Sequence, residues 1–516
     1  MSDVVGIHDR TARLEPLAVL SAAQQSAVFG AEVVVAVGAG ELGTHVGRVL
    51  LETTVELLQR TVRAVMVMLD PRASENERSV MVRIASGLAD VGGRRPRTIP
   101  WDSVPTSKLC VALGVVHPVP AERFIGVGAD GWSGTVYRDA VAPIEDSTWP
   151  IGACTAAALC QAAVVQHLLA QTSSRPPIGP LGDDGVAIVD MLTWSTGVSA
   201  GPRRAVVSPT TLPEISIVGA GAVGHALAWV LRRAPVRARM LHWFDDGQID
   251  ETSLNRCLGA CVSDIGRAKL DIITRQLLYA DIHVNAVPQL WTPARALAPL
   301  VASAVDNNAV RHDIQKMLPE VLLSGETFDA SAAVGRHVVG NGLACLICRH
   351  PRRETGAPVR QSLLLEEAAT KFSLPISAFA EGTFNGGRVL TAELAEHLAR
   401  LAPEQAAALR DGAQRGVDLC GALGDLREAY GSDPSVPATA SFGASSLLAG
   451  IGLVSALVRE PASHADLALS VFELDLFGPI TPLRQPGHRR VPRARQCPGC
   501  GEIAQRLARG LRRTNA

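Results

Sequence analysis

The sequence predicts an α/β protein with two doubly wound, Rossmann-like domains in tandem. Residues 31–43 and 214–224 each join a short run of β-branched residues to the pattern Gly-x-Gly-x-x-Gly and then to a helix-like stretch. This strand–turn–helix order is the context in which the glycine pattern indicates a nucleotide-binding turn. A glycine- and alanine-rich apolar helix is also expected twice, at 151–169 and 441–458. Because both patterns occur once in each half, the sequence predicts a tandem duplication.

Length and charge limit the classes of protein to which this chain can belong. Its 516 residues are enough for two to four domains. The 49 Lys and Arg residues against 50 Asp and Glu give a formal net charge of −1, whereas proteins that coat nucleic acid are basic. We find no uninterrupted apolar run of about 18 residues and no basic-then-apolar order in MSDVVGIHDR. We therefore expect a cytoplasmic protein that binds neither nucleic acid nor a membrane.

The two halves differ in length and in polar residues. We expect a first domain over residues 1–171, a Pro- and Gly-rich linker over 172–205 and a second domain over 206–516. The second domain contains an insertion at about 345–440 with two helix-like stretches. Polar residues are sparse after the first glycine turn and dense after the second. We therefore expect the chemistry to lie in the second domain.

The second glycine turn carries the candidate nucleotide site. Gly219, Gly221 and Gly224 would let the backbone approach a nucleotide. Asp245 stands 26 residues after Gly219, at the end of the next predicted strand. An acid in that place typically accepts hydrogen bonds from a ribose hydroxyl, although a carboxylate there could also cap a turn. This pattern suits NAD and ATP alike.

Four of the ten cysteines form two Cys-x-x-Cys pairs, Cys345/Cys348 and Cys497/Cys500. Without a secretory signal, such pairs indicate metal ligands more than disulfides. Two pairs can complete a tetrahedral four-thiolate site for Zn²⁺. Almost 150 residues separate the pairs, so the site would join distant segments. The alternative is two unrelated pairs or a redox site.

The region after the second strand resembles the ThiF/MoeB and ubiquitin-activating-enzyme superfamily. Its members read Asp-x-Asp-x-Val-x-x-x-Asn-Leu-x-Arg-Gln, then Ile-Gly-x-x-Lys, then Val-Asp-Asn. The two cysteine pairs and an N-terminal arginine complete the family pattern. The resemblance is specific in the second half and looser in the first. The matching stretches are Asp245-Asp246-Gly247, Ser253-Leu254-Asn255-Arg256-Cys257, Ile265-Gly266-Arg267-Ala268-Lys269, Val305-Asp306-Asn307, both cysteine pairs, and His8-Asp9-Arg10.

This resemblance implies ATP-dependent adenylation of the C-terminal carboxylate of a small ubiquitin-like protein or a ribosomal precursor peptide, with release of pyrophosphate. It implies that Arg256 and Lys269 hold the triphosphate and that Asp306 carries Mg²⁺. Asp245 would hold the ribose, and Arg10 would reach in from the first half. The resemblance further implies that the first domain is inactive and the second active, so that a monomer acts as an internal pseudo-dimer. Positive groups suit this chemistry because a carboxylate must attack an anionic phosphate.

The sequence departs from the family pattern at three positions. Ser253 replaces an asparagine, Gly247 replaces the second aspartate of the ribose motif, and Cys257 replaces a glutamine. A serine can still hydrogen-bond a phosphate, but it is shorter. We interpret these changes as a divergent branch, since Arg256 and Lys269 are retained.

Three alternatives remain open from the sequence. Ubiquitin-activating members transfer the acyl group to a cysteine, for which Cys420 is the best candidate; the other interpretation is a buried structural cysteine. An NAD(P)-dependent oxidoreductase would explain the glycine turns and Asp245, but not Arg256, Lys269 or the cysteine pairs. A non-catalytic scaffold is favoured if Ser253 and Gly247 mark decay of the site.

Overall fold

The computed structural model describes most of both predicted halves. The described residues are 22–88, 90–92, 94–103, 109–119, 121, 123–172, 179–197, 210–306, 308–328, 330–350, 383–384, 387–388, 392–401, 403, 406–414, 442–460, 471–481, 488–493, 497–501 and 507. Arg10 and Cys420 lie outside these residues, so their predicted roles stay predictions.

The first sheet has eight strands in the order β3-β2-β1-β4-β5-β6-β7-β8. The first five strands of this order, from β3 through β2, β1 and β4 to β5, are parallel to one another. Strands β6, β7 and β8 follow as antiparallel neighbours. Its central strand reads EVVVAV and is buried along almost its whole length, which is typical of a parallel strand covered on both faces. The strands are β1 (Glu32–Val37), β2 (Ala64–Leu69), β3 (Arg97–Thr98), β4 (Leu109–Leu113), β5 (Phe124–Ala129), β6 (Ser133–Arg138), β7 (Val186–Asp190) and β8 (Ser195–Thr196).

The second sheet repeats this topology. Its nine strands run in the order β12-β11-β10-β13-β14-β15-β18-β19, with β9 paired to β11. The strands from β12 to β14 in this order are parallel, and β15, β18 and β19 are antiparallel. The strands are β9 (Thr210–Leu212), β10 (Ile215–Val218), β11 (Val236–Phe244), β12 (Ile282–Val287), β13 (Leu300–Ser303), β14 (Val321–Phe328), β15 (Ser331–His337), β18 (Val471–Asp475) and β19 (His488–Arg489).

Two mixed, parallel-rich sheets with one strand order agree with the predicted tandem of Rossmann-like folds. The helices of the two halves are α3 (Ala22–Phe29), α4 (His45–Leu58), α5 (Glu75–Gly87), α6 (Ile151–Thr172), α7 (Ala222–Leu231), α8 (Lys269–Leu277), α9 (Asn308–Lys316), α10 (Leu346–Arg349) and α15 (Gly443–Arg459). Short 3-10 turns are η1 (Glu41–Gly43), η2 (Trp101–Ser103), η3 (Glu251–Asn255) and η4 (Val262–Asp264).

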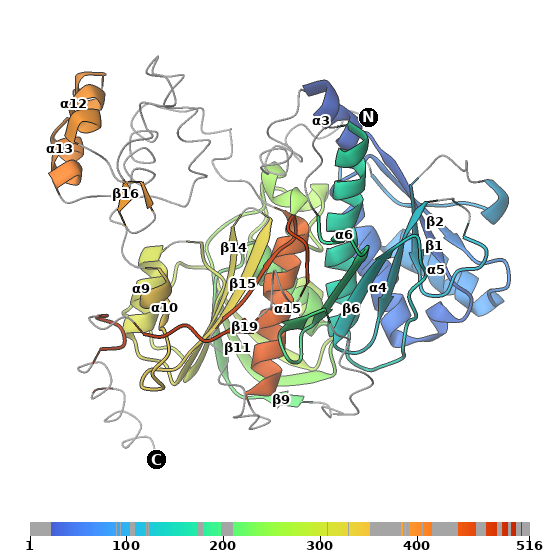
Figure 1. Ribbon diagram of the computed structural model, residues 1–516. Helices are drawn as coiled ribbons and strands as arrows, with labels where there is room; N and C mark the ends of the chain where they lie inside the picture. The colour runs from blue at the N-terminus through green and yellow to red at the C-terminus, as the bar shows by residue number, and fades with distance from the viewer. Residues whose placement is uncertain are drawn as a thin grey trace. The chain divides into compact units, whose positions relative to one another are not determined.

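The two glycine- and alanine-rich helices form where the sequence predicts them, and they pack against each other. Helix α6 also contacts β5 and β6, and α15 contacts β14 and β15, so the pair stands between the two sheets (Figure 1). Every residue of α15 is buried. A Cβ atom at Gly450 would lie 2.6 Å from the Cβ of Ala226, and one at Gly452 would lie 2.3 Å from Val334. The small residues therefore permit close helix packing.

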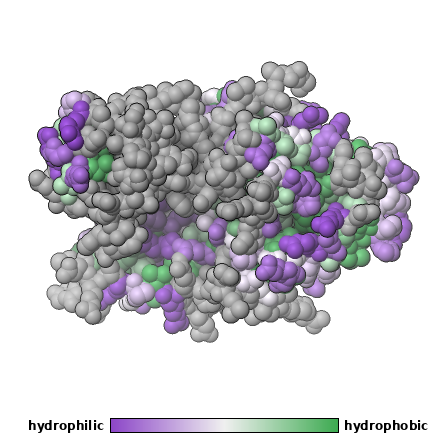
Figure 2. Space-filling model, turned by 45° about the horizontal axis from the view of Figure 1, so that its top comes forward, coloured by the Kyte–Doolittle hydropathy of each residue, from purple (hydrophilic) through white to green (hydrophobic). Residues whose placement is uncertain are grey.

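Helix α6 is long and apolar enough to span a membrane by length and composition, but 83% of its apolar window is buried inside the structure. It packs on α4, α15 and the first sheet, as a core helix does. On the face seen in Figure 2, polar and apolar residues of the described chain are interspersed.

By contacts, the chain divides into two compact units. The first contains both sheets and comprises the described parts of Met1–Val305, Val310–Cys348 and Ser441–Ala516. The second comprises the described parts of Asp306–Ala309 and Arg349–Ala440. Within the second unit, α12 (Ala392–Leu401) packs on α13 (Ala406–Gln414), and β16 (Thr383–Phe384) pairs with β17 (Gly387–Arg388).

Candidate active site

The glycine turn after β10 is formed by three glycines with different tasks. Gly219 has φ +102°, and a Cβ atom there would lie 2.6 Å from the carbonyl oxygen of Ala304. A Cβ at Gly224 would lie 2.6 Å from the carbonyl oxygen of Gly219. At Gly221, which caps the N-terminus of α7, a Cβ would have no atom within 4 Å. Gly219 and Gly224 therefore serve packing, while Gly221 leaves room at a helix N-terminus, where anions are favoured.

Asp245 links the glycine turn to the end of β11 by a hydrogen bond. It comes directly after β11, and its Oδ2 accepts a 2.6 Å hydrogen bond from the backbone N–H of Ala220. Its Oδ1 accepts a 2.7 Å hydrogen bond from the N–H of Gly247. Because each carboxylate oxygen can accept a second bond, Asp245 can shape the turn and still meet a ligand hydroxyl.

Lys269 places an ammonium group beside Asp245. It is the first residue of α8, and its backbone N–H donates a 2.9 Å hydrogen bond to Gly247. A Cβ atom on Gly247 would lie 2.8 Å from the Lys269 Nζ and 2.9 Å from the Asp245 Oδ1. These two charged groups border the space that a side chain at position 247 would enter. Lys269 is half-buried, and its Nζ forms no hydrogen bond or ion pair within the described part of the chain.

Ser253 is used inside its own turn. Its backbone N–H and its hydroxyl both donate to the Asp250 Oδ1, at 2.6 and 2.7 Å, in a capping box that starts η3. Burial alone would raise the pKa of Asp250, but hydrogen bonds from Ser253 and Thr252 and the charge of Arg256 lower it. Ser253 therefore holds the turn, and its predicted contact with a phosphate stays a prediction.

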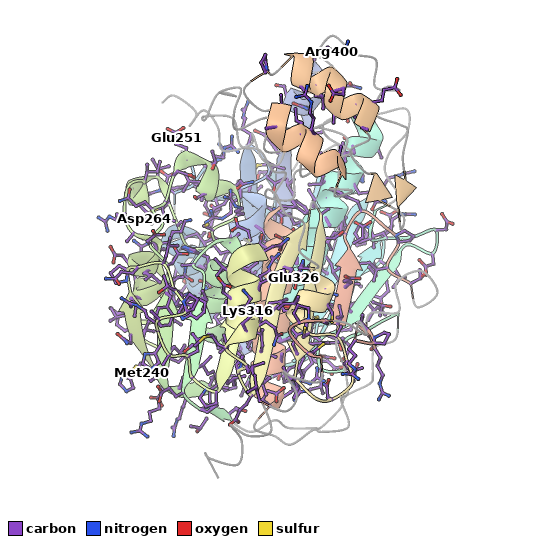
Figure 3. All side chains as sticks on the ribbon, turned by 90° about the vertical axis from the view of Figure 1, so that its left-hand side faces the viewer. Met240, Glu251, Asp264, Lys316, Glu326 and Arg400 are labelled. Atoms are coloured by element: carbon purple, nitrogen blue, oxygen red, sulfur yellow. The ribbon has the colours of Figure 1, made fainter. Side chains whose placement is uncertain are left out.

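Arg256 ends this turn and keeps donors available. Its Nη1 donates to the carbonyl oxygen of Thr252 and, at 2.9 Å, to the Asn255 Oδ1. Its Nε and Nη2 have no partner among the described residues. Figure 3 labels Glu251 and Asp264, which lie in the two 3-10 turns that precede and follow this arginine in the sequence.

Asp306 follows β13, as the sequence predicts, and its side chain is exposed. It belongs to the second compact unit. The structure thus brings together the glycine turn, Asp245 and Lys269, with Arg256 on the connecting loop, while the Mg²⁺ role of Asp306 stays a prediction.

The corresponding turn of the first half is filled by carboxylates. Glu41 is buried, and its Oε1 accepts a 3.0 Å hydrogen bond from the N–H of Val115. The N–H of Gly40, in the turn itself, donates to the Glu77 Oε1 at 2.8 Å. Burial and the nearby Glu77 charge raise the pKa of Glu41, although the bond from Val115 opposes this. A phosphate entering here would meet two acidic side chains.

The four paired cysteines form one cluster. Their sulfur atoms all lie within 4.8 Å of one another. The Cys345–Cys348, Cys345–Cys497 and Cys348–Cys500 sulfur distances are 3.8, 3.5 and 3.4 Å. A disulfide would need about 2.05 Å, whereas a tetrahedral metal with bonds of about 2.3 Å needs sulfur separations of about 3.8 Å. The donor set therefore fits a tetrahedral cation, and folding brings together two pairs that lie far apart in the sequence.

The cluster cannot easily ionise by itself. Hydrogen bonding with Cys348 and Cys500, together with burial, raises the pKa of the Cys345 thiol. Contacts within the cluster raise the pKa of Cys500 to about 12, even though its bond with Cys345 acts in the other direction. A divalent cation would supply the positive charge that stabilises the thiolates.

Two further residues were missed by sequence reasoning. Glu56 and Arg60 of α4 and the turn after it form a buried ion pair, and they hydrogen-bond to the loop that carries Arg256. The available signal was a pair of opposite charges four residues apart in the otherwise apolar stretch VELLQR. That spacing is common on solvated helix faces, so it indicates nothing about a partner almost 200 residues away.

Comparison with known proteins gives matches that cover about half of the chain. Residues 212–442 match the model of the ThiF family. The uncharacterized protein y4jF of Sinorhizobium fredii (strain NBRC 101917 / NGR234) is 26% identical over 311 residues, which are 59% of this chain and 57% of that protein. The match thus spans little more than half the length of this relative.

Solved structures with a similar chain include two of E. coli MccB. The one with MccA-N7isoASN has a TM-score of 0.35 and 13% identity, and the match covers 56% of this chain and 67% of that one. The one with ATP has a TM-score of 0.29 and 16% identity, covering 56% and 66%.

Proposed function

Because residues 212–442 match the model of the ThiF family, we propose that this chain binds ATP at its second glycine turn and adenylates the C-terminal carboxylate of a peptide or small protein. The observation that carries the proposal is the Lys269 ammonium, which lies beside Asp245 and Gly247 without an ion-pair partner among the described residues. A half-buried cation next to an open turn suits an anionic ligand.

The reaction forms one bond and breaks one. A carboxylate oxygen of the substrate bonds to the α-phosphorus of ATP, and the bond from that phosphorus to the bridging oxygen breaks. Pyrophosphate leaves with the electron pair, and an acyl-adenylate remains. Negative charge collects on the phosphate oxygens, where Lys269 and the free Nε and Nη2 donors of Arg256 would stabilise it. Asp306 is the proposed ligand of Mg²⁺, which would neutralise further charge.

The first half acts as a supporting partner in this proposal. Glu41 and Glu77 occupy its glycine turn, which disfavours a triphosphate there. Arg10 is the residue of this half that we propose reaches the active site. The substrate class is a small ubiquitin-like protein or a precursor peptide, and Cys420 is the proposed acceptor if a thioester follows.

We further propose that the four-cysteine cluster holds Zn²⁺ with a structural role. The cluster joins α10, which carries Cys348, to the segment after β19 that carries Cys497 and Cys500. All four positions are occupied by protein sulfurs, and a closed site of this kind has no position for a reacting water.

Titration of the full chain with Mg²⁺ and ATP, or with NADH, tests the proposal by calorimetry. We expect ATP to bind and Lys269→Ala to weaken it at least about tenfold, the size expected for a lost charge-assisted contact. Lys316→Ala is the matched control, since that exposed lysine pairs with Asp313 on α9. Binding of NADH without binding of ATP would favour the oxidoreductase alternative and overturn the proposal.

A further inference from the structure

The loop that carries Arg256 is held by a helix of the other half. Arg60, in the turn that follows α4, donates from Nη1 to the carbonyl oxygen of Leu254. Its Nη2 donates to the carbonyl oxygen of Ala260 at 3.0 Å. The planar guanidinium therefore bridges both ends of the loop 254–260, a task for which its fixed fork of donors is suited.

Glu56 completes this clamp. Its Oε1 accepts hydrogen bonds from Arg60 and, at 2.8 Å, from the backbone N–H of Gly259. The side chains of Arg60 and Glu56 are 0% and 1% exposed. Because the pair is out of water, its geometry is fixed by the groups that it contacts, and loss of either partner would leave a buried charge.

Residues of the second half also hold this loop. His225 of α7 and Gln276 of α8 both contact the carbonyl oxygen of Leu258, at 3.2 and 2.8 Å. Arg275 of α8 donates to the carbonyl oxygen of Gly259 at 3.1 Å. The backbone around Arg256 is thus held by α4 and the turn after it, and also by α7 and α8.

We propose that Glu56 and Arg60 are positioning residues of the ATP site: they fix the loop so that the free donors of Arg256 face the triphosphate. This inference rests on the proposed function. The first half would then support the ATP site in two ways: through Arg10, and through the buried residues of α4 and the turn after it. Neither residue touches the ligand, so both act through Arg256.

The test measures ATP affinity in the presence of Mg²⁺ for the full chain and three variants. Glu56→Met/Arg60→Met replaces the ion pair by apolar residues of similar volume, a change that buried pairs can tolerate without loss of folding. Arg60→Lys keeps the charge opposite Glu56 but cannot bridge both carbonyl groups, and it serves if the double variant fails to fold. Arg63→Met is the control, because that side chain is 66% exposed and pairs loosely with Glu32.

We expect the Met pair and Arg60→Lys to weaken ATP binding about tenfold or more, with a Tm near that of the wild type and Arg63→Met unchanged. Adding Arg256→Ala to either variant should cause no further loss of ATP affinity, because both changes remove the same interaction, the contact of Arg256 with the triphosphate. Hydrogen exchange should speed up in residues 254–260 and not in α6 or α15.

The outcomes separate the positioning role from the proposed function. If the wild type binds ATP and both clamp variants bind it equally well, the positioning role is wrong and the proposed function stands. The positioning role is also wrong if the losses from Arg256→Ala and from the clamp variants add fully. If the wild type binds no ATP, the proposed function fails and this inference fails with it.

Discussion

Gly221 and Gly224 differ in what surrounds them, although the glycine pattern treats them alike. We predict that Gly221→Ala keeps the free energy of unfolding within about 1 kcal/mol of the wild type, since φ there is −71° and space is open. ATP binding should weaken because the added methyl group faces the ligand. Gly224→Ala should instead cost about 1–3 kcal/mol of stability, because its Cβ meets the backbone of Gly219.

Denaturant unfolding and calorimetry on the two glycine variants check this prediction. A stable Gly224→Ala, or a Gly221→Ala with unchanged ATP affinity, would contradict the assignment of packing to one glycine and ligand approach to the other.

His225 makes stability depend on pH. Burial lowers its pKa to about 3, the bond to Leu258 opposes this, and the charges of Lys269 and Arg60 act with burial. The unfolded state therefore binds more protons than the folded state between about pH 3 and 6.5. The neutral imidazole contributes its full stability above about pH 6.5, and this contribution falls as the pH drops towards 3.

The free energy of unfolding, measured by urea titration at several pH values, checks the prediction. The slope below about pH 6.5 should be shallower in His225→Gln than in the wild type. Equal slopes would mean that His225 does not titrate on unfolding.

At the scale of elements, the cysteine cluster joins α10 to the segment around Cys497 and Cys500. We expect metal analysis to give one Zn²⁺ per chain. Cys345→Ser should lose the metal and lower Tm by more than about 5 °C, with ATP affinity changed much less than by Lys269→Ala. Cys110→Ser is the control, since that buried cysteine lies on β4 of the other sheet. Zinc-free protein with wild-type Tm would contradict the assignment.

The sequence predicts local elements well because their signals are local. The strands before both glycine turns and the helices α6 and α15 follow from hydrophobic runs and small residues that repeat in each half. Asp245 could be placed near the turn from strand order, and Lys269 from the resemblance to the family motif. The clamp of Glu56 and Arg60 could not, because its partners lie about 200 residues away and are backbone groups, which leave no residue pattern.

The capping bond of Ser253 could not be predicted from the sequence either, for a related reason. Its hydroxyl is occupied by Asp250, and the choice between a capping bond and a ligand bond depends on rotamer and loop shape. The presence of Cys257 where the family pattern has a glutamine also has a local explanation. Cys257 is buried with Leu254 and Ile272 in an apolar cluster, which a polar glutamine would not fit.

At the scale of the whole molecule, the two halves share one interior. Trp229 of α7 donates to the Thr53 hydroxyl of α4 at 3.1 Å, and Arg233 pairs with Glu52 at 2.6 Å. We predict that residues 206–516 expressed alone do not bind ATP and aggregate, because α7 and α15 would expose apolar faces. Co-expression with residues 1–205 should restore a soluble, ATP-binding complex. An isolated second half that is monomeric and active would contradict this prediction.

The central claim is that nucleotide binds at the second glycine turn and not at the first. Hydrogen exchange of the full chain, with and without Mg²⁺ and a non-hydrolysable ATP analogue, tests it most directly. We predict slower exchange in residues 219–231 and 245–277, with residues 38–58 unchanged. Protection confined to residues 38–58, or no protection in either half, would contradict the account.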